Sequence, residues 1–84
     1  MFMIWIDDQP LADREMIAKL YEVSDRTVRR HCTPVRHEPR AGRPRGFGGI
    51  ALYDALAAAD ALANVAPRPD RTVAALRSMR KPTP

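Results

Sequence analysis

Two helix-start signals and one stop lie between Asp13 and Pro34, and they leave room only for two short helices joined by a tight turn. The side chains of Asp13 and Ser24 can accept hydrogen bonds from the free amide groups at a helix start. Pro34 ends the second helix, because the residue before a proline is pushed out of the helical region. Residues 21–24 separate the two helices. We therefore predict one helix after Asp13 and a second over residues 25–32.

One face of this helix pair can form a small apolar core, which leaves the other face of the second helix free to contact a partner. The positions that can share the core are Ile17, Ala18, Tyr21, Val23 and Val28. The side chains that project outward from the second helix are Asp25, Arg26, Arg29 and Arg30. The exposed face of the second helix is therefore predicted to be mainly basic.

Short strand signals flank the helix pair on both sides. The apolar run Met1–Ile6 predicts a strand that covers the core or, alternatively, an edge through which two copies associate. Ile50–Tyr53 can alternate its two faces as a second short strand.

The last third of the chain has helical signals. Asp54 can cap a third helix from Ala55 to about Val65, which is rich in alanine and leucine and is closed by Pro67. Residues 70–81 could form a further short helix or a frayed basic tail. In the helical alternative, the residues on one side are Val73, Leu76 and Met79.

Positive charge is concentrated in the middle of the chain. The formal net charge is +4 over 84 residues. Residues 1–25 carry six acids against Arg14 and Lys19, which gives −4, whereas residues 26–46 carry seven arginines against Glu38, which gives +6. Such a sharp change of sign indicates a surface for a polyanion, although a basic stretch can also be a solvated loop.

Size and composition exclude several classes of protein. A chain of 84 residues leaves little room for an enzyme cleft. Cys32 is the single cysteine, which rules out an intramolecular disulfide and suits a reducing compartment. No apolar run approaches the roughly 18 residues of a membrane span, and Met1–Ile6 lacks the basic start of a signal peptide. We therefore expect a cytoplasmic protein that does not bind a membrane.

Chemistry at a metal or catalytic site is not indicated either. His31, Cys32 and His37 are close in sequence, but a closed zinc site needs four ligands and no CxxC or HxxxH partner is present. The sequence places no base or nucleophile at a spacing from Asp7 and Asp8 that would suggest general acid–base chemistry. We expect no catalytic residue, no metal, no cofactor and no small-molecule ligand.

The stretch Arg14–Thr33, REMIAKLYEVSDRTVRRHCT, resembles the helix-turn-helix of the winged MerR-type and excisionase-like DNA-binding proteins. In that pattern Ala18 lets the second helix approach the first, Val23–Ser24 forms the turn and cap, and Val28 is the buried position of the recognition helix. Glu22 stands where those families usually have glycine. A left-handed backbone there would cost a non-glycine residue roughly 1–2 kcal/mol.

The resemblance covers roughly residues 11–65 and implies a two-stranded wing after the recognition helix. It makes Thr33–His37 the first wing strand, EPRAGRPRGFGG at residues 38–49 the tip, Ile50–Tyr53 the return strand and Asp54 the cap of the next helix. The predicted fold class is mainly α with a small β wing, a winged helix-turn-helix of three helices. The predicted DNA-binding domain covers residues 1–66, with the helix-turn-helix at 13–33, the wing at 34–53, the capping helix at 54–66, and a basic tail or short helix at 67–84.

Within the wing tip, Gly42–Arg45 (GRPR) is similar to the core of AT-hook peptides and to the minor-groove arms of some recombinases. Glycine lets the backbone approach the groove floor, proline holds the chain extended, and arginine enters a narrow A·T-rich groove. Ala41 stands where the AT-hook usually has another arginine. Three interpretations stay open: minor-groove insertion, contact with phosphates only, and a disordered linker.

The resemblance implies a sequence-specific double-stranded DNA-binding protein without catalytic activity. Its recognition helix would enter the major groove, where arginine binds guanine O6 and N7 bidentately, while the wing lies on the backbone or minor groove. The expected DNA-binding residues are Ser24, Asp25, Arg26, Thr27, Arg29 and Arg30 in the recognition helix and Arg36, Arg40, Gly42, Arg43, Pro44 and Arg45 in the wing. A single module reads few base pairs, so a homodimer or a cooperative multimer on repeated sites is expected to supply specificity.

The resemblance implies two alternative biological roles for this DNA binding. The excisionase-like resemblance implies a recombination directionality factor that bends DNA, and the MerR-type resemblance implies transcription regulation. An alternative from another class is a protein-interaction adaptor or inhibitor that docks the Met1–Ile6 run or the alanine-leucine helix on a partner and does not bind DNA.

Overall fold

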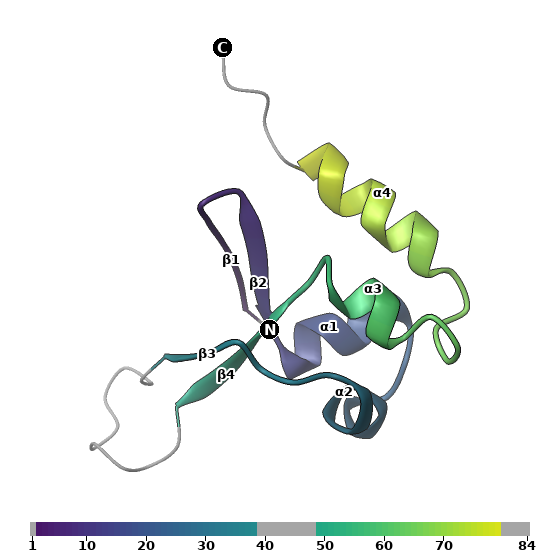
Figure 1. The fold of residues 1–84 in the computed structure, drawn as a ribbon, viewed down its shortest axis with the longest axis horizontal. Coiled ribbons are helices and arrows are strands. Elements are labelled where there is room, and N and C mark those ends of the chain that lie inside the picture. Colours follow the sequence, from purple (N-terminus) through teal and green to yellow (C-terminus); the bar gives the residue numbers. More distant parts are fainter. Residues whose placement is uncertain (1, 39–48, 80–84) are drawn as a thin grey trace.

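The computed structural model describes residues 2–38 and 49–79, which form four strands and four helices (Figure 1). In chain order these are β1 (Met3–Ile6), β2 (Gln9–Asp13), α1 (Arg14–Tyr21), α2 (Asp25–His31), β3 (Arg36–Glu38), β4 (Ile50–Asp54), α3 (Ala58–Ala61) and α4 (Pro69–Met79). The strands form one antiparallel sheet in the order β1-β2-β4-β3. The predicted mainly α fold with a two-stranded wing is therefore wrong, because the chain is an α+β protein with a four-stranded sheet.

The difference arises from an N-terminal hairpin, β1–β2, which was not predicted from the sequence. Asp7 and Asp8 form its two-residue turn, and both have positive φ, at 50° and 64°. That backbone matches the twist of a hairpin, and aspartate tolerates it better than most residues other than glycine. β2 then pairs with β4, which joins this hairpin to the β3–β4 hairpin.

Pro10 lies inside β2 without breaking the β1–β2 ladder. The Asp13 N–H donates to the Phe2 carbonyl at 2.9 Å, which makes Met3 and Ala12 a non-hydrogen-bonded pair. By alternation, Pro10 and its partner Trp5 form another such pair. The amide hydrogen that proline lacks is therefore not needed by β1, and Pro10 is accommodated there in a fully buried position.

Both predicted helix starts are confirmed. An Asp13 carboxylate oxygen accepts a hydrogen bond from the Met16 N–H at 2.8 Å and caps α1. The Ser24 hydroxyl oxygen accepts from the Thr27 N–H at 3.1 Å and caps α2. The residue after α1, Glu22, is left-handed at φ 58° and ψ 45°, in the position where the sequence resemblance places a glycine.

The third helix is shorter than predicted. Regular α3 covers Ala58–Ala61, whereas the prediction was Ala55 to about Val65. An Asp54 carboxylate oxygen accepts from the N–H groups of Leu56 and Ala57, at 3.0 and 3.1 Å, and several following amides bond three residues back. These turns replace regular helix at both ends but keep the apolar spacing. The residues that they bury are Ala55, Ala58, Leu62 and Ala66.

Two other predicted elements are shifted. The first strand after α2 is Arg36–Glu38 rather than Thr33–His37, because the chain leaves α2 in irregular conformation before the Val35 N–H reaches the Leu52 carbonyl at 2.8 Å. The C-terminal helix covers Pro69–Met79, close to the predicted residues 70–81. Its buried residues are Thr72 and Leu76, whereas Met79 is half exposed.

A single apolar core joins the helices to one face of the sheet. The Tyr21 hydroxyl donates to the Ala55 carbonyl at 2.5 Å, which ties α1 to the start of the α3 region. Burial raises the pKa of Tyr21 to about 12, helped by the nearby charges of Cys32 and Asp54, so the phenol stays neutral. The fully buried residues of this core include Ile17, Val28 and Leu76 in the helices and Leu62 directly after α3.

Candidate nucleic-acid interface

Helix α2 is amphipathic around a single buried residue. Val28 is fully buried against the core, whereas Arg26, Arg29 and Arg30 are exposed, as predicted. Arg26 and Arg30 are four residues apart and share the face of the helix opposite Val28. The core contact of Val28 therefore fixes which way the arginines point, and they form one basic face directed away from the protein.

The positive charge of this face is not neutralised within the described residues. The guanidinium groups of Arg26, Arg29 and Arg30 form no ion pair with an acidic side chain in residues 2–38 or 49–79. Like charges three and four residues apart on a helix repel each other by a few tenths of a kcal/mol. Binding of a polyanion would relieve this repulsion.

The first turn of α2 is held by its own polar side chains. The hydroxyl groups of Ser24 and Thr27 lie 2.8 Å apart and share a hydrogen bond, and the Ser24 hydroxyl also caps the helix. Asp25 is exposed in the first turn, where the helix dipole favours an acid. These residues fix the start of the helix, and the Asp25 carboxylate is also able to accept a hydrogen bond from a cytosine amino group.

The β3–β4 hairpin lies on the same side of the molecule as α2, in the lower half of Figure 1. Arg36 on β3 is exposed and forms an ion pair with Glu38 on the same strand. The Glu38 carboxylate partly neutralises the positive charge that Arg36 would otherwise present to a partner. The other predicted wing residues lie outside the described residues. These are Arg40, Gly42, Arg43, Pro44 and Arg45.

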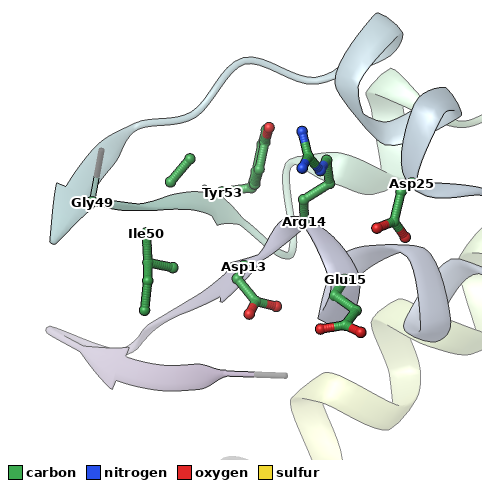
Figure 2. Close-up of a pocket in the computed structure, with 8 residues that line it drawn as sticks. Asp13, Arg14, Glu15, Asp25, Gly49, Ile50 and Tyr53 are labelled. Atoms are coloured by element: carbon green, nitrogen blue, oxygen red, sulfur yellow. The ribbon is translucent and has the colours of Figure 1, made fainter. Parts of the chain in front are cut away.

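A hollow of about 450 Å³ separates α2 from β4 (Figure 2). Arg14, at the start of α1, is exposed and extends its side chain toward Tyr53, while Asp25 approaches from α2. The residues that line the hollow are Asp13, Arg14, Glu15, Asp25, Gly49, Ile50, Ala51 and Tyr53. Arg14 therefore lies between the two elements that were predicted to contact DNA, and it is not among the site residues predicted from the sequence.

A sequence signal for Arg14 was present. A basic residue in the first turn of a helix is unfavourable next to the positive end of the helix dipole. Binding of an external anion by such a residue would offset this unfavourable interaction.

Helix α4 and Arg68, the residue before it, hold the turn between α1 and α2. The Arg68 guanidinium donates to both carboxylate oxygens of Glu22, at 3.1 and 2.5 Å, and this hydrogen-bonded pairing raises the pKa of Arg68. The Thr72 hydroxyl donates to the Leu20 carbonyl at 2.8 Å, which satisfies an acceptor at the end of α1. These contacts position the end of α1 and therefore the start of α2.

Replacing Glu22 tests the left-handed turn. We expect the Glu22→Gly variant to have a free energy of unfolding about 1 kcal/mol higher than Glu22→Ala, because only glycine adopts φ 58° without strain. Both variants lose the pairing with Arg68, so their difference isolates the backbone. Urea unfolding followed by circular dichroism measures it, and equal stabilities would contradict the left-handed assignment.

The other polar groups near α2 do not form a metal site. Cys32 is half buried, and burial raises the pKa of its thiol. No three His, Cys, Asp or Glu side chains in the described part of the chain could together hold a metal ion.

Among the helices in residues 2–38 and 49–79, none has the length and apolar character that a membrane-spanning helix requires.

The arrangement can bind an extended anion through the basic face of α2, with Arg14 and the β3–β4 hairpin beside it. Comparison with known proteins adds no assignment, because no protein-family model, no curated protein and no solved structure matches this chain.

Proposed function

We propose that this protein binds double-stranded DNA, with α2 in the major groove and the β3–β4 hairpin on the adjacent backbone or minor groove. The observation that carries the proposal is the set of exposed arginines on α2, opposite the buried Val28. A short helix fixed at one face and basic on the other has the shape and charge that a major groove accepts.

Each part of the basic surface has a distinct task in this proposal. Arg29 and Arg30 read base edges, and Arg26 contacts a base or the flanking phosphate. Arg14 binds a phosphate at the mouth of the hollow between α2 and β4, where the residue is exposed, although Asp13, Glu15 and Asp25 also line this hollow. Arg36 holds the β3–β4 hairpin against the DNA backbone, where a phosphate replaces Glu38 as its ion-pair partner.

We propose that the protein serves as a recombination directionality factor or as a transcription regulator, as the sequence resemblance implies. Selection of bound duplexes from a random pool separates these roles in part. Closely spaced direct repeats would favour an architectural factor, and an isolated inverted repeat would favour a regulator of transcription.

Salt dependence is the direct test of the proposed function. We expect log affinity for duplex DNA to fall linearly with log salt concentration, with a slope of about −0.9 for each phosphate neutralised. Phosphate contacts from Arg14, Arg26 and Arg36 would alone give a slope of about −2.7. Fluorescence anisotropy of a labelled duplex between low and moderate salt measures the slope.

Absence of duplex binding at low salt would overturn the proposal. That result would favour a protein-interaction adaptor or inhibitor, for which the exposed Phe2 and Ile4 supply an apolar contact surface.

A further inference from the structure

Strand β1 has an open outer edge. It is the terminal strand of the sheet, paired on one side with β2, and no described residue pairs with its other side. Phe2 and Ile4 are each 39% exposed next to this edge. An unpaired strand edge displays backbone donors and acceptors that another strand can bind.

The β1–β2 ladder identifies which backbone groups are open. The hydrogen bond from the Asp13 N–H to the Phe2 carbonyl makes Met3 and Ala12 a non-hydrogen-bonded pair. The N–H and C=O groups of Met3 and Trp5 therefore point away from β2, and those of Ile4 point toward it. The open edge consists of the backbone groups of Met3 and Trp5.

The two edges of the sheet differ in how they discourage pairing. The opposite edge strand, β3, carries the charged side chains of Arg36 and Glu38, and charge is a common means of blocking an edge. Strand β1 has the sequence MIWI, with no charge and no proline. Its edge is therefore both open and unprotected.

We propose that β1 pairs antiparallel with β1 of a second copy of this chain about a two-fold axis at Ile4. In this register Met3 lies opposite the partner's Trp5, and Ile4 lies opposite the partner's Ile4. Each open N–H of Met3 and Trp5 then meets an open carbonyl of the other copy, and only apolar side chains face each other. The occupant is a second copy because this register leaves no open group of either strand unmatched.

The proposed pairing leaves the DNA-binding surface free. In Figure 1, β1 lies on the upper side of the molecule, and α2 with the β3–β4 hairpin lies on the lower side. The pairing does not depend on DNA binding and is tested without DNA. If the proposed function also holds, the two-fold axis gives two copies of α2 that read an inverted repeat.

A disulfide test is specific for the register. In a Cys32→Ser background, we expect Ile4→Cys to form a covalent dimer on mild oxidation, because the Cα atoms of a non-hydrogen-bonded pair lie about 4.5 Å apart. The matched control is Phe2→Cys, which has the same exposure. Its partner's cysteine would lie four residues along the strand, about 13 Å away, so we expect little cross-linking.

A non-reducing gel measures how fast each variant forms the covalent dimer and so distinguishes the possible outcomes. Cross-linking of Ile4→Cys at least several-fold faster than of Phe2→Cys would support the proposal. Equal rates would indicate random collision, and faster cross-linking of Phe2→Cys or none in either variant would indicate another register or no pairing. Each of these results overturns the proposal.

Sedimentation equilibrium of the unmodified chain provides a test that needs no cysteine. We expect the average mass to rise toward twice the monomer mass as concentration increases. Ile4→Lys should abolish this rise, because it places like charges opposite each other on the two-fold axis. Val35→Lys adds the same charge at another exposed apolar position and should leave the rise intact. A native chain that stays monomeric at millimolar concentration would overturn the proposal.

Discussion

Replacing Leu76 by alanine is expected to lower the free energy of unfolding by about 2–5 kcal/mol. Leu76 is fully buried and belongs to the same core as Ile17 and Leu62. The variant loses the transfer free energy of the removed atoms and leaves a cavity that the surrounding helices can only partly fill. Because small domains are stable by only about 5–15 kcal/mol, the loss would be a large part of the total.

The matched control for Leu76→Ala is Met79→Ala, which lies on the same helix with half of its side chain exposed. We expect this control to change the free energy of unfolding by no more than about 0.5 kcal/mol. Urea unfolding followed both by circular dichroism and by Trp5 fluorescence measures the two variants. A small effect of Leu76→Ala, or loss of helix signal without a change at Trp5, would mean that α4 folds separately from the core.

The parts of the fold that could be predicted from the sequence are those fixed by local signals. Asp13 and Ser24 cap helices through hydrogen bonds to amides three residues away. The cap residue and the amide that it caps therefore lie within one short stretch of sequence, where the pattern can be recognised. The buried positions Ile17 and Val28 follow from the helical repeat once those starts are known.

The N-terminal hairpin could not be predicted because its local signals point elsewhere. Its turn is Asp7-Asp8 rather than the glycine-containing pair that usually marks a two-residue hairpin. Pro10 is a residue that argues against a strand, and only the pairing pattern with β1 shows that its missing N–H does no harm. Pairing between β2 and β4, which connects Ala12 with Tyr53, has no local signal at all.

The candidate site also has a part that could be predicted from the sequence and a part that could not. The outward direction of Arg26, Arg29 and Arg30 was predicted, because it follows from helical geometry around Val28. The contacts that position the helix were missed: the Arg68–Glu22 and Thr72–Leu20 pairs join residues 46 and 52 positions apart. Such contacts depend on how α4 packs against α1, and no spacing in the sequence encodes that packing.

Replacing both Arg29 and Arg30 by alanine is expected to remove most of the preference for a selected DNA site. A bidentate arginine–guanine contact discriminates against the wrong base by about 1–3 kcal/mol. Loss of two such contacts lowers the ratio of specific to non-specific affinity by roughly 30-fold or more. Competition binding between a selected duplex and a scrambled duplex at one fixed salt concentration measures this ratio.

The stability of this double variant separates a binding defect from a folding defect. Arg29 and Arg30 are exposed and form no ion pair within the described residues, so their removal leaves the core intact. Alanine is also a better helix former than arginine, which offsets the lost interaction with the helix dipole. We therefore expect the free energy of unfolding to stay nearly constant while the specificity ratio falls.

The control for lost charge is Arg77→Ala, which removes one positive charge near the C-terminal end of α4, the end that lies farther from α2 in Figure 1. We expect it to leave the specificity ratio nearly unchanged, because this end of α4 lies away from the proposed DNA surface. If the Arg29 and Arg30 variant instead weakens binding to the selected and scrambled duplexes equally, these arginines contact phosphates only. In that case the salt slope would also become less steep by about 2, since each lost phosphate contact removes about one unit.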